Sequence, residues 1–245
     1  IPDVVVQQTV ETIERDKNRA SVCLWSIANE SDWYDVFDTV GALAAELDPT
    51  RPAIFNHDDY DGEDIVSGAS CTTNSVSLPM YVLLEEFGVN SAEMTTIHAY
   101  TGSQAIVDGP KSKTRRGRAA AENIVPTTTG ASTATTDILP ELKGKFEAMA
   151  IRVPVPSGSI TEIVVDLPGN PSPEEINDAM VEYADGELDG TMGIIDDPIV
   201  SRDIVGRHNG SAVDLAKTST VQGGKLAKVF AWYDNEMGYT SQMLR

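Results

Sequence analysis

Cysteine, histidine and basic residues are all scarce in this sequence. Its 245 residues include 2 cysteines and 3 histidines, and 18 Lys and Arg stand against 38 Asp and Glu. The two thiols, Cys23 and Cys71, lie far apart without metal-ligand spacing, so we expect no metal site. A structural disulfide is not expected either, because the chain shows no export signal.

Long apolar runs are absent as well. No stretch of about 18 apolar residues occurs, so we expect no transmembrane helix. The first residues, Ile1-Pro2-Asp3, form neither a basic start nor an apolar signal core, which predicts a cytoplasmic protein. They also lack an initiator Met, and we interpret the chain as a fragment. The formal charge of −20 predicts no nucleic-acid or membrane partner, and such an acidic excess resembles proteins from high-salt cells.

The first 54 residues combine two helical patterns with two short apolar runs. Apolar residues at helical spacing predict helices over Val5–Arg15 and Val36–Leu47. The run Ser21–Ile27 has the length of a strand, and Ala53–Phe55 follows two closely spaced prolines.

A different pattern begins near residue 64. Ile65–Ser67 is a short strand candidate that leads to Cys71. Apolar positions from Val76 to Phe87 then predict a helix that stops at Gly88. We expect Pro79 to lie in the first turn of that helix or at a slight kink.

The second half of the chain is rich in strands. Ser172-Pro173-Glu174-Glu175 is a capping box with proline at the first helical position, so a helix is expected to start there. The strand candidates are Thr95–Ala99, Ala148–Val153, Thr161–Leu167 and Lys228–Tyr233. Long strand-rich segments broken by few helices favour an α+β fold.

Cys71 and His98 are the candidate nucleophile and base. Cys71 stands at a strand-to-helix junction, where helix amides stabilise a thiolate and could also hold an oxyanion. His98 follows a short strand and could reach the same end of a sheet. A Cys and a His at this spacing are by themselves weak evidence, since a buried thiol and a satisfied histidine give the same pattern.

Six blocks extend the pattern. They occur in order as Ser70-Cys71-Thr72-Thr73-Asn74, Thr96–Thr101, Arg115–Ala120, Pro126–Ala131, Arg152–Pro154 and Trp232–Glu236. In this order they resemble the glyceraldehyde-3-phosphate dehydrogenase family over about residues 56–245. The resemblance implies the α+β catalytic domain of that family over residues 55–245, together with the last strand of the nucleotide-binding domain. That domain has a mixed, largely antiparallel sheet with helices on one face.

The resemblance also implies a role for each matching residue. Cys71 would form a thiohemiacetal with the aldehyde and then an acyl-thioester, and His98 would activate it. The substrate phosphate would be bound by Thr101, Arg116 and Arg152, and the attacking phosphate by Ser70, Thr72, Thr129 and Gly130. Arginine forks and hydroxyl donors suit phosphate oxygens. Asn235 would hold the nicotinamide of NAD or NADP.

The implied substrates and partners follow from the same resemblance. The chain would bind glyceraldehyde 3-phosphate and inorganic phosphate, yield 1,3-bisphosphoglycerate in glycolysis, and self-associate as a homotetramer. No nucleic acid, membrane or metal is implied.

Residues 1–54 depart from the family pattern. A Rossmann domain is expected there, yet no Gly-x-Gly-x-x-Gly turn occurs. Instead Ser21–Ser31 and Asp48–Pro52 resemble family 2 glycoside hydrolases, in which Glu30 beside Asn29 would be the acid/base. A retaining glycosidase needs a second carboxylate from a later barrel strand, so Glu30 is interpreted as an orphan in a βα fragment.

Three functions therefore stand as hypotheses: a phosphorylating aldehyde dehydrogenase, a catalytically crippled chimeric remnant that keeps the catalytic-domain fold, and, with least support, a glycosidase. The join near residues 54–57 is compatible with a natural fusion, a mispredicted gene or an assembly artefact.

Overall fold

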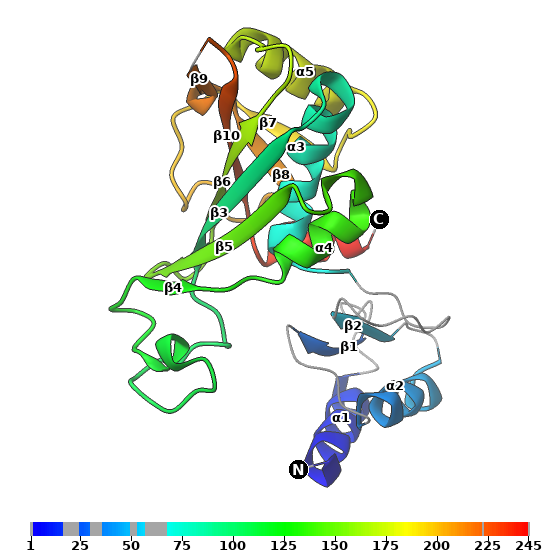
Figure 1. Ribbon diagram of the computed structural model, residues 1–245. Coiled ribbons are helices and arrows are strands. Elements are labelled where there is room, and N and C mark those ends of the chain that lie inside the picture. The colour runs from blue at the N-terminus through cyan, green and yellow to red at the C-terminus, as the bar shows by residue number, and fades with distance from the viewer. Residues whose placement is uncertain are drawn as a thin grey trace. The chain divides into compact units, whose positions relative to one another are not determined.

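The computed structural model describes residues 2–16, 25–29, 36–49, 53–56, 68–221 and 223–244. The chain divides into two compact units, Ile1–Ser70 and Cys71–Met243. Figure 1 shows the two units, each with its own helices and sheet. They are described separately.

The first unit is a single β-α-β arrangement preceded by a helix. Its elements are α1 (Pro2–Asp16), β1 (Trp25–Asn29), α2 (Val36–Leu47) and β2 (Ala53–Asn56). The strands β1 and β2 are parallel neighbours. Ile13 of α1 and Ala44 of α2 are buried together, so the apolar stripes of these two helices face each other. Both predicted helices are confirmed, as is a strand overlapping Ser21–Ile27; Glu30 and residues 21–24 lie outside the described residues.

The second unit contains one mixed sheet. Its strand order is β4-β5-β3-β6-β10-β8-β7, and β9 pairs with β10. The pairs β3–β5 and β7–β8 are parallel and the remaining pairs are antiparallel. The strands are β3 (Ser91–Ala99), β4 (Val125–Thr127), β5 (Phe146–Val153), β6 (Ser159–Asp166), β7 (Met192–Ile195), β8 (Ser211–Asp214), β9 (Ser219–Val221) and β10 (Leu226–Tyr233).

Helices cover one face of this sheet. The helices are α3 (Cys71–Phe87), α4 (Ala131–Ile138), α5 (Pro173–Asp185) and α6 (Met237–Met243), with short 3-10 turns at Thr114–Gly117, Pro140–Leu142 and Leu215–Lys217. In Figure 1, α3, α4 and α5 lie on the same side of the strands. Residues of β6 and β10 alternate between buried and partly buried, as expected when one face meets a core. The sequence-based prediction of an α+β fold with helices on one face is therefore confirmed.

The core lies between α3 and the sheet. Met80 and Leu83 of α3 are fully buried against Met94, Ile163 and Val229 of the central strands. Burying such side chains contributes roughly 1.5–3 kcal/mol each, which fixes α3 on the sheet and so fixes the position of its first residue, Cys71.

Two predictions about α3 have different outcomes. The stop at Gly88 is confirmed, since Gly88 has a φ of +70° and its N–H donates to the carbonyl of Leu84. Of the two alternatives for Pro79, the first turn is wrong, because the helix begins at Cys71 and Pro79 lies well inside it, and the slight kink stays a prediction. The burial of the apolar residues around Pro79 outweighs the one helical hydrogen bond that a proline removes. The expected strand Ile65–Ser67 lies outside the described residues.

The start of α5 has the predicted capping box. The Ser172 hydroxyl accepts from the Glu175 N–H at 3.1 Å, and the Glu175 carboxylate accepts from the Ser172 N–H at 2.8 Å. These two bonds satisfy amides that the helix itself cannot pair.

We expect Ser172→Ala to lower the free energy of unfolding by about 1 kcal/mol, because the first turn of α5 loses its acceptor. Urea unfolding followed by circular dichroism measures this change. Ser172→Asp keeps an acceptor and serves as the matched control. Equal midpoints for wild type and Ser172→Ala would show that the cap contributes nothing.

Candidate functional site

The thiol of Cys71 lies at the first residue of α3. It is partly exposed, whereas the next two side chains, Thr72 and Thr73, are buried. The unpaired amides of a helix N-terminus give it a partial positive charge, which favours an anion at this point. The position thus provides one of the two stabilising influences that a reactive thiol needs.

His98 supplies the second group. It occupies the end of β3, and its Nε2 is 3.4 Å from the Sγ of Cys71. The sequence placed these residues 27 positions apart, and the packing of α3 on β3 brings them into hydrogen-bonding distance.

Two groups contact the Nδ1 of His98. The Ala99 carbonyl oxygen lies 2.6 Å from it, and the Nη1 of Arg152 lies 2.8 Å from it and donates to the same carbonyl at 3.0 Å. A carbonyl only accepts, so the first contact favours a proton on Nδ1 and a lone pair on Nε2 that faces the thiol. A guanidinium only donates, so the second contact favours the opposite tautomer.

The surroundings keep His98 neutral. Burial is the largest cause and, together with the positive charges of Arg152 and Arg116, it lowers the pKa of His98 from 6.5 to about 3, against the opposing bond to Ala99. At neutral pH the ring is therefore not a resting positive charge beside Cys71. This bears on the role implied by the resemblance, in which His98 activates Cys71, because a neutral ring can act there only as a base or hydrogen-bonding group.

Two arginines and two hydroxyls form a continuous cationic cluster beside the histidine. Arg152, paired in register with His98 on the neighbouring strand β5, donates to Thr101 at 3.3 Å. Thr101 and Ser103 share a hydrogen bond of 2.9 Å, and Arg116 donates to Ser103 at 3.2 Å. The structure thus brings together the predicted residues Thr101, Arg116 and Arg152. Hydroxyls between two guanidinium groups can bind phosphate oxygens.

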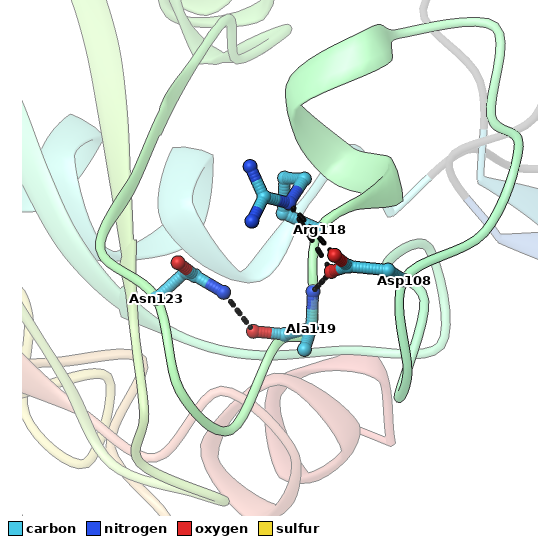
Figure 2. Close-up of polar contacts among 4 residues, drawn as sticks. All are labelled: Asp108, Arg118, Ala119 and Asn123. Atoms are coloured by element: carbon cyan, nitrogen blue, oxygen red, sulfur yellow. Dashed lines mark hydrogen bonds and ion pairs between the residues drawn. The ribbon is translucent and has the colours of Figure 1, made fainter.

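The loop that carries Arg116 is closed by an ion pair, drawn in Figure 2. Arg118 contacts both carboxylate oxygens of Asp108 at 3.1 Å, and Asp108 also accepts from the Ala119 N–H at 2.8 Å. Gly117 is required here, since a Cβ would meet the carbonyl oxygen of Gly109 at 2.3 Å. The loop therefore holds the Arg116 backbone in one place.

The other predicted anion-binding residues lie on two helix starts. Ser70 directly precedes α3, and the Thr72 hydroxyl is buried at 2.9 Å from the Tyr233 hydroxyl. Thr129 and Gly130 precede α4, where Thr129 accepts from the Ala131 N–H at 3.2 Å. Thr72 thus directs its hydroxyl into the protein, so its side chain supports the site from within.

Asn235 is buried next to the same strand ends. Its Oδ1 accepts from the Gly158 N–H and the Ser159 hydroxyl, both at 3.1 Å. Ser159 in turn accepts from the N–H of Ala99, the residue after His98. Asn235 is therefore held rigidly by β6, and one hydrogen of its Nδ2, beyond the one given to Glu236, has capacity for a ligand.

Sequence reasoning missed two residues of this site, Ser103 and Tyr233. Ser103 joins the two arginines, and the Tyr233 ring lies edge-on to His98 with centroids 5.8 Å apart. Tyr233 belongs to a block that carried the resemblance, but only contacts between distant strands give it a role. Among the described residues no cluster could hold a metal ion and no helix is long and apolar enough to cross a membrane.

These observations define a class of protein: an α+β domain in which a thiol–imidazole pair lies beside two arginines. Comparison with known proteins gives the family. The family described as "Glyceraldehyde 3-phosphate dehydrogenase, C-terminal domain" matches residues 70–235. The chain belongs to this family, and the resemblance stated from its motifs is confirmed.

Named relatives agree with this assignment. Glyceraldehyde-3-phosphate dehydrogenase of Haloarcula vallismortis is 53% identical over 199 residues, which cover 80% of this chain and 59% of the relative. The Streptococcus pyogenes protein of that name is 50% identical over 195 residues, covering 78% of this chain and 57% of the relative. Glyceraldehyde-3-phosphate dehydrogenase 1 of Bacillus subtilis is 44% identical over 207 residues, which cover 84% of this chain and 62% of the relative. The chain thus spans about three fifths of each relative.

A second family, "Glycosyl hydrolases family 2, TIM barrel domain", matches residues 2–105. The match covers less than half of the chain and overlaps the first family over residues 70–105. It agrees with the β-α-β arrangement of the first unit, which is one repeat of the eight that a barrel needs.

The depressed pKa of His98 predicts a specific pH dependence of stability. On acidification the unfolded chain takes up a proton on this residue near pH 6.5, whereas the folded chain does so only near pH 3. The stability from the neutral buried ring is therefore full above pH 6.5 and is lost as the pH falls below it. We expect roughly 1.5 kcal/mol of loss from His98 between pH 6.5 and 5.

Urea unfolding at several pH values measures this loss. His98→Gln should flatten the slope in this window, and His208→Gln, which removes an exposed histidine, should leave it unchanged. Identical slopes for His98→Gln and wild type would contradict the neutral buried ring.

Proposed function

We propose that this chain carries the chemistry of a phosphorylating, NAD(P)-dependent glyceraldehyde-3-phosphate dehydrogenase. The observation that carries the proposal is the distance of 3.4 Å between the Cys71 sulfur and the Nε2 of His98, and the proposal assigns the lone pair of the neutral ring to this nitrogen. Because the chain spans about three fifths of its relatives, the activity of the whole enzyme is itself part of the proposal.

The first step is attack by the thiol. Nε2 of His98 takes the proton of Cys71 as the sulfur bonds to the aldehyde carbon. The aldehyde oxygen gains negative charge, which the amides at the start of α3 and the newly protonated imidazole can stabilise. The imidazolium then gives that proton to the oxygen, so the product is a thiohemiacetal with a hydroxyl and the ring is neutral again. Arg152 keeps the imidazole oriented, since both bind the Ala99 carbonyl.

The second step is oxidation of the thiohemiacetal. Nε2 of His98 removes the hydroxyl proton while a hydride leaves the same carbon, so a thioester remains on Cys71. A bound nicotinamide dinucleotide would accept that hydride. Asn235 fits this group in one respect, because its Nδ2 has a hydrogen to offer a carboxamide oxygen and its Oδ1 is fixed by Gly158 and Ser159.

The third step is transfer of the acyl group. An oxygen of inorganic phosphate attacks the thioester carbon and the Cys71 thiolate leaves, giving 1,3-bisphosphoglycerate. The leaving sulfur takes back the proton that His98 gained in the second step, which regenerates the thiol and the neutral ring. Two anionic groups must then be bound at once. The cluster of Thr101, Arg116 and Arg152 is proposed for the substrate phosphate, and Ser70, Thr129 and Gly130 for the attacking one. Thr72 would contribute to the second group through its backbone at the start of α3, since its hydroxyl contacts Tyr233.

Further proposals follow from the family. A cytoplasmic location and a homotetramer are expected, and size-exclusion chromatography with light scattering tests the second.

A direct assay tests the proposed reaction. Wild type is given glyceraldehyde 3-phosphate, inorganic phosphate and NAD or NADP. Formation of the reduced nicotinamide is followed by its absorbance at about 340 nm. Iodoacetamide labelling, resolved by peptide mass spectrometry, compares Cys71 with Cys23. Fast labelling of Cys71 with turnover supports the enzyme.

The remnant hypothesis gives a different result. Fast labelling of Cys71 without nucleotide binding in calorimetry would show that the thiol chemistry persists in a chain that cannot turn over. Equally slow labelling of Cys71 and Cys23 would refute the proposed nucleophile. Release of nitrophenol from a nitrophenyl galactoside would support the glycosidase.

The cationic cluster generates its own prediction. We expect Arg116→Gln to weaken inorganic phosphate or substrate binding by at least about tenfold, because a charge-assisted bond contributes roughly 1.5–3 kcal/mol. Phosphorus NMR titration or protection of Cys71 from alkylation measures the affinity. Arg115→Gln is the matched control, since Arg115 is the exposed neighbour of Arg116 in the same 3-10 turn. Equal losses in both variants would point to a general charge effect.

A further inference from the structure

Tyr233 is a buried phenol directly beside the Cys71–His98 pair. It is 1% exposed, and its hydroxyl lies 2.9 Å from the Thr72 hydroxyl and 2.7 Å from the Thr96 hydroxyl. Thr72 follows Cys71 at the start of α3, and Thr96 precedes His98 by two residues on β3. One hydroxyl thus connects the element that carries the thiol to the strand that carries its base.

The sheet register explains how a residue of β10 reaches β3. The strand β6 lies between them, where Ser159 is paired with Tyr233 and Thr161 is paired with Thr96. Residues two apart on a strand point to the same face, so these small side chains lie in the row between the phenol and β3. Ser159 and Thr161 are 1% and 0% exposed, and their small size lets the tyrosine pass over β6.

The phenol stays uncharged near neutral pH. Burial, and after it the charge of the nearby Cys71, raises the pKa of Tyr233. The hydrogen bonds to Thr72 and Thr96 lower this pKa but do not outweigh the burial. A neutral phenol can donate to one threonine and accept from the other, so the connection is satisfied at both ends. The ring lies at 73° to the imidazole of His98, a T-shaped contact that adds apolar surface around it.

We propose that Tyr233 is a positioning residue that sets the separation between the Cys71 sulfur and the His98 imidazole. The proposal rests on the proposed function, since it assigns to Tyr233 the upkeep of the thiol–base contact and no contact with substrate. The hydroxyl holds α3 and β3 at one spacing, and the ring edge holds the imidazole plane.

The test is Tyr233→Phe, which keeps the ring and removes the hydroxyl. We expect alkylation of Cys71 by iodoacetamide at pH 7 to slow roughly fivefold to tenfold, as for loss of a buried hydrogen bond. Because the Tyr233 hydroxyl holds Thr72 at the start of α3, its loss should loosen the thiol's position against the helix amides that favour a thiolate. The midpoint of the pH–rate profile should then move upward toward that of an ordinary thiol, about 8.5. A purely structural defect would change the labelled fraction but not this midpoint.

Two further variants complete the experiment. Tyr183→Phe removes the same hydroxyl from a contact with Glu86 on the surface, and we expect the wild-type rate and midpoint. Thr96→Val removes one partner of Tyr233 and should reproduce the shift, with little added effect in the double variant. It also keeps the proposal testable if Tyr233→Phe does not fold.

The outcomes separate the two proposals. A fast Cys71 in wild type with an unshifted midpoint in both Tyr233→Phe and Thr96→Val would overturn the positioning role alone. A wild-type Cys71 that labels no faster than Cys23 would overturn the proposed function and the positioning role together.

Discussion

The contact between Nδ1 of His98 and the carbonyl of Ala99 is the interaction on which the site depends. At 2.6 Å from a pure acceptor, Nδ1 is favoured as the protonated nitrogen, and that tautomer leaves the Nε2 lone pair for the sulfur of Cys71. The carbonyl belongs to the residue after the histidine, so the last residues of β3 hold both the base and the group that orients it. Arg152 binds the same oxygen from β5 and restrains it further.

The mixed sheet makes this arrangement possible. In the parallel pair β3–β5 the residues His98 and Arg152 are neighbours, so imidazole and guanidinium meet at one edge of the sheet. Such proximity would be unfavourable for two cations. Because burial and the arginine together hold the pKa of the ring at about 3, the histidine is neutral and the arginine carries the charge alone. The arrangement thus provides a base and an anion-binding charge within one buried cluster.

The sequence predicted the elements with strong local signals and not those fixed by distant contacts. The sequence correctly predicted the features that depend on residues close in the chain: the helical periodicity, the capping box at Ser172 and the helix stop at Gly88. The short strands β4, β7, β8 and β9 were not predicted, since pairing with longer neighbours stabilises them. Motifs placed Cys71 and His98 in one site, whereas Tyr233 and Ser103 became visible only once β10, β6 and β3 were aligned. Pro79 is an opposite case, because the burial of α3 in the core outweighs the local tendency of a proline to end or kink a helix.

The net charge of the whole chain is negative, whereas the arginine cluster of the candidate site is positive. A net charge of −20 repels anions at long range, whereas the guanidinium groups of Arg116 and Arg152 can attract an anion at contact distance. Salt treats these two effects differently. The screening length is about 10 Å at 0.1 M and about 3 Å at 1 M salt, so added salt removes the distant repulsion first. Arg152 is 3% exposed, and its attraction for a bound anion is screened far less. In concentrated salt the repulsive field of the acidic chain is therefore suppressed, while the contacts of the buried Arg152 guanidinium persist.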